Sequence, residues 1–373
     1  MHILFAASFR KGNFADFIYL TLVQMGHRVT WLAPVDCPYA GSMKVPLDLN
    51  IAAVVRDIPE KPDLFLFTDA SEGIAFLPRG VAECGIPTAF WALDNHLNLR
   101  WHKEYCALFD HVFFTQYDRM AATQSAYGYP HLHWLAYCCD RQAHADIGVE
   151  RDIDVGHVGG ITADRKKFFA ALERQGVHVT TNDRFLLREE VGHFYSRCKI
   201  VLNICARYDL NMRSFEAPAA GALVIGQKDL DSSFYRIFTP GVDCDVHWFD
   251  DAAAVIKKYL ADDGLRRRVA EAGKAVALGG HTYHHRMQEL LRVCANGTTT
   301  RRSALSGTWR AHLKMALTLW NRQFNQKREA FLELKKAFGQ NPAGTAASLA
   351  HYGLLRIAEK WEKFRWSLGK APV

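Results

Sequence analysis

The sequence predicts an α/β protein with two doubly wound parallel sheets and a helical C-terminal extension. Short apolar, β-branched segments such as 199–205 alternate with amphipathic helical segments. This alternation is typical of strands buried on both faces of a parallel sheet. It begins at residue 2, restarts near residue 154 after a linker expected over 137–150, and ends near residue 300. We therefore expect two doubly wound domains facing a cleft, residues 1–150 and 151–299, and an extension over 300–373.

Composition is that of an ordinary globular protein. Of the 373 residues, 49% are hydrophobic and 23% are charged, and no apolar run approaches the roughly 20 residues that span a bilayer. The first residues pass directly into a strand without the features of a signal peptide. The nine cysteines are scattered and contain no C-x-x-C pair, which favours free thiols in a reducing compartment. We therefore expect a cytoplasmic protein.

The net charge of +7 is unevenly distributed. Residues 300–373 carry a net +10, whereas the rest of the chain carries −3. A basic segment beside a nearly neutral body indicates an anionic partner, either a membrane surface with acidic head groups or a protein. We expect no nucleic-acid partner.

The first half reads as one doubly wound domain. Its expected strands are 2–7, 28–33, 63–68, 87–92, 111–114 and 131–135, and its clearest helices are 14–25, 97–108 and 117–127. The loop after the first strand contains Gly12 and Asn13 but no G-x-G-x-x-G, so a dinucleotide fingerprint is absent. Gly12 permits close approach of the backbone to a substrate. The alternative is an ordinary tight turn with Asn13 as a helix cap.

Asp94 and His96 follow the strand 87–92. Ligands of parallel α/β sheets bind outside the carboxyl ends of the strands, so both side chains are expected to face the cleft. Either is a candidate general base. The alternative is a strand-end cap with a hydrogen-bonded histidine.

The second half repeats the alternation. Strands are expected near 154–160, 177–181, 199–205, 222–225 and 245–249, and helices over 164–175, 187–197, 250–261, 264–278 and 282–294. Between two of the strands lies a polar loop and short helix that contain Asn211, Arg213 and Glu216. The carboxyl-end rule makes these three residues candidates for ligand binding, and arginine is a forked donor suited to phosphate. The alternative is a capped helix with a salt bridge.

Metal chemistry has weak support in the sequence. Three D-x-D sequences and His131-x-His133 lack partners at the spacing of a metal site. We therefore expect no metal site and no cofactor.

The extension has a four-three apolar spacing followed by a second amphipathic pattern. The first comprises Leu313, Leu317, Trp320, Phe324, Phe331, Leu334 and Phe338, and the second comprises Leu354, Ala358, Trp361 and Leu368. A helical hairpin, a coiled-coil dimer and a membrane-surface helix all fit this pattern. Packing on protein is our first expectation, because an apolar stripe with aromatic residues usually belongs to a core.

Four motifs lie in order over residues 155–292: Val158-Gly159-Gly160 followed by Asp164-Arg165, the segment Tyr195 to Asn203, Asn211-x-Arg213-x-Phe215-Glu216-Ala217 with Gly221, and His281-Thr282-Tyr283-His284-His285-Arg286-Met287. In their order and spacing they resemble the glycosyltransferase group 1 domain of the CgeB-like (spore-maturation-type) family. The first half resembles the companion domain through Trp91-Ala92-Leu93-Asp94-x-His96 and the segment Trp134 to Asp140.

The resemblance implies a GT-B architecture in which the second domain binds a nucleotide-diphosphate sugar and the last helices return to the first domain. Arg165, beside Gly160, and Arg213 would then stabilise the leaving diphosphate, with no metal required. Glu216 would bind the ribose. Retaining relatives often carry a second glutamate eight positions earlier, where this chain has Tyr208, so the stereochemistry stays open.

The implied reaction is transfer of a sugar to a hydroxyl of a glycan, glycolipid or protein acceptor. Two other classes stay open. One is a non-catalytic GT-B-like binding or assembly protein, which the residue at 208 favours. The other is a nucleotide-sugar epimerase of the same fold.

Overall fold

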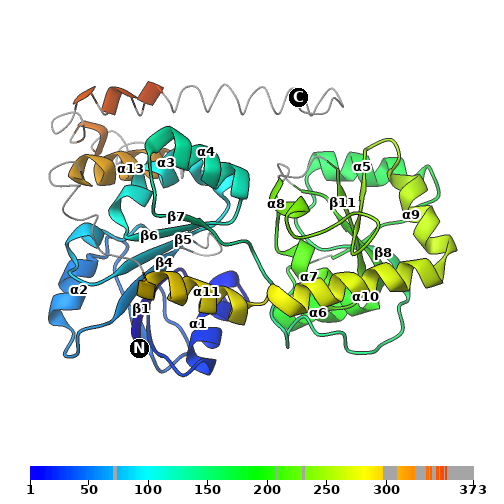
Figure 1. Ribbon diagram of the computed structural model, residues 1–373, viewed down its shortest axis with the longest axis horizontal. Coiled ribbons are helices and arrows are strands. Elements are labelled where there is room, and N and C mark those ends of the chain that lie inside the picture. The colour runs from blue at the N-terminus through cyan, green and yellow to red at the C-terminus, as the bar shows by residue number, and fades with distance from the viewer. Residues whose placement is uncertain are drawn as a thin grey trace. The chain divides into compact units, whose positions relative to one another are not determined.

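The computed structural model describes residues 1–69, 74–182, 184–205, 209–228, 232–296, 309–323, 333–335, 337, 342–343, 345–347 and 349–350 (Figure 1). The chain forms two compact units. The first comprises residues 1–10 and 14–135 and the described residues after 287, and the second comprises 11–13 and 136–287. These boundaries differ from the divisions expected at 150 and 299. Helix α11 (Tyr283–Asn296) begins in the second unit and ends in the first, so the expected return of the chain is confirmed.

Within the described residues, the first unit has a seven-stranded parallel sheet in the order β3-β2-β1-β4-β5-β6-β7. Its strands are β1 (His2–Ala6), β2 (Arg28–Ala33), β3 (Ser42–Lys44), β4 (Leu64–Thr68), β5 (Thr88–Ala92), β6 (His111–Phe114) and β7 (Leu132–Trp134). The chain winds outward from β1 to β3 and then in the other direction from β4, so the expected doubly wound arrangement is confirmed. The sheet therefore has its topological switch point between β1 and β4.

Helices and short 3-10 turns connect these strands. They are α1 (Phe14–Gln24), α2 (Ile51–Asp57), η1 (Val81–Glu83), α3 (Asn95–Tyr105), η2 (Cys106–Leu108) and α4 (Tyr117–Tyr127). The central strands are completely buried and rich in aromatic side chains. Such strands are stable because helices on both faces remove their side chains from water.

The first helix of the extension, α13 (Trp309–Gln323), packs on the first unit. Met315, Leu317 and Trp320 belong to the same apolar core as the sheet, and His312 Nδ1 lies 2.8 Å from Glu104 Oε2. The expectation that this amphipathic helix packs on protein is confirmed. The apolar positions Phe324, Phe331 and Phe338 and the second amphipathic pattern, 354–368, lie outside the described residues.

The second unit has a five-stranded parallel sheet within the described residues, in the order β12-β11-β10-β8-β9. Its strands are β8 (Ile153–His157), β9 (Thr180–Thr181), β10 (Cys198–Asn203), β11 (Leu223–Gln227) and β12 (Asp245–His247). Its helices are α5 (Ala163–Glu173), α6 (Arg188–Arg197), α7 (Arg213–Ala219), α8 (Ser232–Tyr235), α9 (Ala252–Ala261) and α10 (Asp263–Gly280).

The polar stretch that precedes β8, expected to link the domains over 137–150, is largely part of the second unit. Cys138 and Cys139 are fully buried, and the Cys139 backbone exchanges two 3.0 Å hydrogen bonds with His281 and Tyr283. All nine cysteines of the sequence lie in the described residues, and all are free thiols. In the part of the chain that the structure describes, no helix is both long and apolar enough to cross a membrane.

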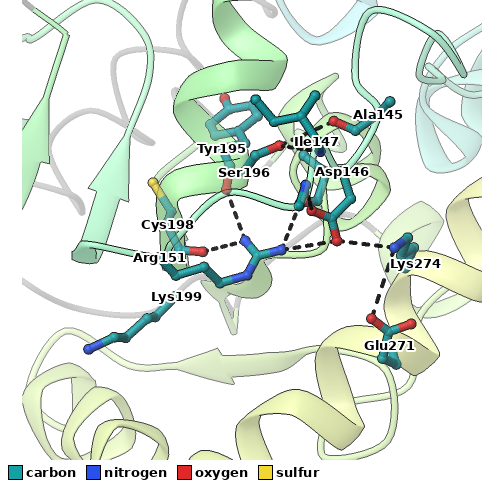
Figure 2. Close-up of polar contacts among 12 residues, drawn as sticks. Ala145, Asp146, Ile147, Arg151, Tyr195, Ser196, Cys198, Lys199, Glu271 and Lys274 are labelled. Carbon is teal, nitrogen blue, oxygen red and sulfur yellow. Dashed lines mark hydrogen bonds and ion pairs between the residues drawn. The ribbon is translucent and has the colours of Figure 1, made fainter.

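Arg151 joins four segments of the second unit, as Figure 2 shows. Its guanidinium donates to the carbonyls of Tyr195, Cys198 and Ala220 at 3.3, 2.8 and 3.0 Å. It also donates to Asp146 Oδ2 at 3.2 Å, and Lys274 Nζ reaches the same oxygen at 3.1 Å. Arg151 therefore fixes the end of α6 and the end of α7 against the segment that leads into β8.

Replacing Arg151 with alanine should lower the free energy of unfolding by about 2–4 kcal/mol, because three carbonyls and one carboxylate lose a charged donor. Urea unfolding of the whole chain measures the change. Arg197→Ala is the matched control, because Arg197 pairs with Asp152 through side chains that are 50% and 48% exposed, and such surface pairs contribute at most about 1 kcal/mol. Equal losses in the two variants would contradict the structural role of Arg151.

Candidate functional site

The carboxyl edge of the second sheet brings together several of the residues singled out from the sequence. β8 ends at His157 and is followed by the turn that contains Gly159 and Gly160. Thr162 then caps α5, its hydroxyl accepting from the backbone N–H of Arg165 at 3.3 Å. The neighbouring strand β10 ends at Asn203, and α7 begins at Arg213. The pairing of β8 with β10 places both loops at the same edge.

Arg213 connects the ends of β8 and β10. Its Nε and Nη2 donate to the Val158 carbonyl at 2.9 and 2.6 Å, and its Nη1 donates to Asn203 Oδ1 at 2.5 Å. Asn203 is fully buried and also accepts from Asn211 Nδ2 at 3.1 Å. The guanidinium is therefore fixed at the edge by neutral acceptors.

Arg165 is held in the same way. Its Nη1 and Nη2 donate to the carbonyls of Gly160 and Ile204, both at 2.6 Å. Burial and then the neighbouring Arg213 lower the pKa of Arg165, which shows that two like charges lie near each other. Neither arginine makes an ion pair with a carboxylate of the described residues. A guanidinium has five N–H donors, so Arg165 retains donors for an anion.

α7 departs in one respect from its simpler interpretation, a capped helix with a salt bridge. Its N-cap residue, Met212, makes no side-chain capping hydrogen bond. Arg213 bonds to Val158 and Asn203 rather than to Glu216, while Glu216 lies within ion-pair distance of His144. The expected cap is therefore absent, and a ligand-binding role for these residues stays a prediction.

The glycine turn leaves room beside these arginines. Gly159 has φ +142°, and a Cβ there would lie 2.7 Å from Arg213 Nη2, so the position requires glycine. A Cβ on Gly160 would meet no atom within 4 Å, and Gly160 is exposed. The N-terminus of α5, which carries a partial positive charge, begins at the same place.

His157 is a residue of this edge that the sequence did not single out. It is fully buried, and its Nδ1 donates to the Leu202 carbonyl at 2.9 Å. Its Nε2 is then an acceptor, and it has no hydrogen-bond partner among the described residues. It lies 3.5 Å from the Cβ position of Gly159, so it faces the glycine turn. Burial, followed by Arg213, lowers the pKa of His157 to about 2, which keeps the ring neutral.

Glu216 lies deeper than Arg213. Glu216 is 8% exposed, and its Oε1 lies 3.5 Å from Nε2 of His144. His144 Nδ1 accepts from the Asp140 backbone N–H at 2.9 Å, so the Nε2 that faces Glu216 carries the hydrogen. Burial lowers the pKa of His144. Sequence patterns missed this contact because His144 comes from the stretch interpreted as a linker.

The remaining candidates lie in loops that follow two strands of the first sheet, β1 and β5. Gly12 follows β1 and has φ +75°, and Asn13 is buried before α1. Asp94 follows β5 and is the sole non-glycine residue with positive φ in the described part of the chain, at 49°. His96 is half-buried in the first turn of α3. The structure thus places the candidates in two groups, one at the carboxyl edge of each sheet.

Metal ligands are not gathered at either group. Among the described residues, no three His, Cys, Asp or Glu side chains are arranged to hold a metal ion. The positive charges at the second sheet are those of Arg165 and Arg213.

Comparison with known proteins follows this geometry. Residues 159–292 match a family model described as glycosyl transferase-like. A search of curated proteins returned no match. Many solved structures are similar to this chain, and three of them are compared with it. HepE of Anabaena, in complex with UDP and glucose, has a TM-score of 0.61 at 12% identity, covering 79% of this chain and 99% of HepE.

The other two are more distant. A glycosyltransferase from Rickettsia africae has a TM-score of 0.56 at 10% identity, with 79% of this chain and 97% of that chain covered. Sucrose-phosphate synthase from Thermosynechococcus elongatus has a TM-score of 0.51 at 10% identity, with coverage of 78% and 98%. The chain therefore has the GT-B fold of two parallel-sheet α/β domains, and its residues 159–292 form a glycosyl transferase-like domain.

Proposed function

We propose that the protein is a glycosyltransferase that moves a sugar from a nucleotide-diphosphate donor to a hydroxyl-bearing acceptor. The observation that carries the proposal is the pair Arg165 and Arg213. Both guanidiniums are held by carbonyl and amide oxygens at the carboxyl edge of the sheet, without an ion pair to a described carboxylate. Two adjacent positive charges that make no direct ion pair with a described carboxylate attract an anion, and a diphosphate is the anion that glycosyl transfer releases.

The donor would lie over the glycine turn. The diphosphate would bind between Arg165, Arg213 and the N-terminus of α5, which together stabilise the negative charge that develops on it. We propose that this charge from the protein makes a metal ion unnecessary. The buried His157 Nε2 would accept a hydrogen bond from a hydroxyl of the donor, and Glu216 would bind the ribose. HepE of Anabaena was solved with UDP-glucose, which supports a nucleotide sugar as the donor class.

The acceptor would bind at the loops that follow β1 and β5. Gly12 and Asn13 would contact it, and Asp94 or His96 would take the proton from its hydroxyl if the reaction inverts the anomeric centre. Glycans, glycolipids and proteins all offer such a hydroxyl, and surface-glycan assembly is the setting we propose. The CgeB-like subgroup belongs to the same proposal. Nine free thiols support a reducing cytoplasmic location, with the basic segment 300–373 docking on an anionic membrane surface or a protein partner.

Glu216→Gln should reduce the stabilisation that a nucleoside diphosphate gives to the protein, because an amide replaces one of the two acceptor oxygens. A thermal-shift panel of UDP, GDP, ADP and dTDP measures it. A ligand at 100 times its Kd stabilises the folded state by about 2.7 kcal/mol. Glu173→Gln is the control, because Glu173 is 61% exposed near the end of α5. If Glu216→Gln showed the same nucleotide-induced rise in melting temperature as wild type, Glu216 would not belong to the donor site. If no nucleotide raised the melting temperature of wild type, the donor site itself would be rejected.

A non-catalytic binding protein is the second candidate, favoured by tyrosine at position 208, which lies outside the described residues. An epimerase of this fold would convert the donor into another nucleotide sugar without an acceptor and without net release of nucleotide. A nucleotide-release assay with and without a mixed glycan acceptor pool, combined with chromatography of the nucleotide sugar, separates the three functions. Acceptor-dependent release supports the transferase, a new nucleotide sugar without an acceptor supports the epimerase, and binding without either product supports the binding protein.

A further inference from the structure

Asp94 has an unfavourable backbone conformation. Its φ of 49° and ψ of 43° lie in the left-handed region, which residues other than glycine seldom adopt. Its carbonyl nevertheless accepts from the N–H groups of Leu97 and Asn98 at 2.8 and 2.9 Å, so the turn leads directly into α3. A strained residue keeps such a conformation only when its surroundings impose it, and such residues concentrate at functional sites.

Asp69, at the end of β4, binds both sides of this turn. Its Oδ1 accepts from the Leu93 backbone N–H at 2.7 Å, and its Oδ2 accepts from Asn98 Nδ2 at 3.2 Å. Leu93 precedes Asp94, and Asn98 lies in the first turns of α3. A carboxylate that bonds before and after the strained residue restricts the backbone between them.

His102 fixes Asp69 in turn. Its Nε2 lies 2.8 Å from Asp69 Oδ2, and its side chain is fully buried while that of Asp69 is 6% exposed. The ring also packs against Trp101, with centroids 4.2 Å apart, and against Phe90 at 5.5 Å. His102 therefore has little freedom to leave this position.

The hydrogen-bond network determines the tautomer of His102. The Thr115 backbone N–H and hydroxyl bond to Asn95 Oδ1 at 2.8 and 3.1 Å. The amide nitrogen of Asn95 must then face His102 Nδ1, 3.1 Å away, and donate to it. His102 thus carries its hydrogen on Nε2 and donates it to Asp69.

We propose that Asp69 and His102 are positioning residues that hold Asp94 in its left-handed conformation for transfer to the acceptor. The inference rests on the proposed function for the role of Asp94. The clamp itself rests on the distances and burial above. Neither residue is proposed to contact the substrate.

Substitutions at 94 and 102 test the clamp through stability alone. If the clamp imposes the strain, Asp94→Gly relieves that strain only while His102 is present. The change in melting temperature caused by Asp94→Gly should therefore be more favourable in the wild-type background than in His102→Leu, where the turn is free to relax. The larger unfolded-state freedom of glycine affects both backgrounds equally and cancels. Equal changes in the two backgrounds would overturn the clamp.

Two control variants accompany this double-mutant cycle of residues 94 and 102. His102→Gln places an amide N–H near the position of Nε2, so Asp94→Gly should again behave as in wild type. His131→Leu removes another buried histidine of the same unit, one that bonds to the Cys106 carbonyl at 3.0 Å, and should leave the effect of Asp94→Gly unchanged. If His131→Leu changed the effect of Asp94→Gly as much as His102→Leu does, the inference would also be overturned, because any loss of stability in the unit would then produce the same result.

The role of His102 in sugar transfer is tested separately, by the turnover rate. We expect His102→Leu to lower kcat by about 10- to 100-fold, as misplaced groups commonly do, with the nucleotide thermal shift retained and with activity restored in His102→Gln. If Asp94→Gly and His102→Leu were coupled in stability but His102→Leu left kcat unchanged, the positioning role in transfer would be overturned. Absence of any nucleotide shift or transfer in wild type would reject the proposed function instead, while the stability cycle would still decide the clamp.

Discussion

Arg165→Ala is expected to weaken binding of the nucleoside diphosphate by about 10- to 100-fold. A hydrogen bond to a charged group contributes about 1.5–3 kcal/mol, and every 1.4 kcal/mol is about tenfold in affinity. Arg165 is bonded to two backbone carbonyls, so its removal leaves no unpaired buried carboxylate. Isothermal titration with the nucleotide found in the thermal-shift panel measures the loss.

Two further variants show whether the loss of affinity comes from the guanidinium of Arg165. Arg165→Lys keeps the charge but not the forked geometry, and should lie between wild type and alanine. Arg197→Ala removes an exposed arginine paired with Asp152 at the opposite edge of the sheet and should bind normally. If Arg165→Ala bound the nucleotide as tightly as Arg197→Ala, the pair of arginines would not be the anion site, and the proposed function would lose its main support.

Asp94→Asn is expected to lower turnover by about 10²–10⁴-fold, the usual contribution of a general base. Asparagine tolerates the left-handed conformation that the structure shows at this position, so the melting temperature should change little. Because the donor residues belong to the other unit, the nucleotide thermal shift should stay. Steady-state transfer assays at saturating donor measure the effect on kcat.

His96→Asn and Asp48→Asn complete the test of Asp94. Asp48 is exposed in the same unit, so its amide variant should retain full activity. If His96→Asn lost turnover while Asp94→Asn retained it, His96 would be the base, and the strained residue would have a structural role alone.

Much of the fold could be predicted because each strand carries its own signal. β2, β6 and α4 have the expected bounds, since their apolar or amphipathic patterns end at clear turns. β3 and α2 were missed. β3 has three residues, of which two are exposed, and α2 has seven, so neither has a periodic pattern long enough to recognise.

The candidate site could be predicted in part for a similar reason. Parallel strands place all of their carboxyl ends at one edge, so Arg213 was expected there, and the family resemblance added Gly160 and Arg165 to the same site. His157 was missed because a histidine at the end of a strand gives no sign of which ring nitrogen is paired. The contact of Glu216 with His144 was missed because it joins a helix to a segment without a regular pattern.

The amino-acid sequence by itself determined the class of fold, the repeat of two doubly wound units and the loops that carry the candidate chemistry, because these depend on local apolar periodicity and chain order. The tertiary structure alone decided which acceptors hold Arg165 and Arg213, where α13 packs, and that Asp69 and His102 hold the turn at Asp94. Each of these depends on strand register and on contacts between distant segments. Local sequence patterns do not predict those contacts, because the hydrogen bonds form only after the sheets have brought the loops together.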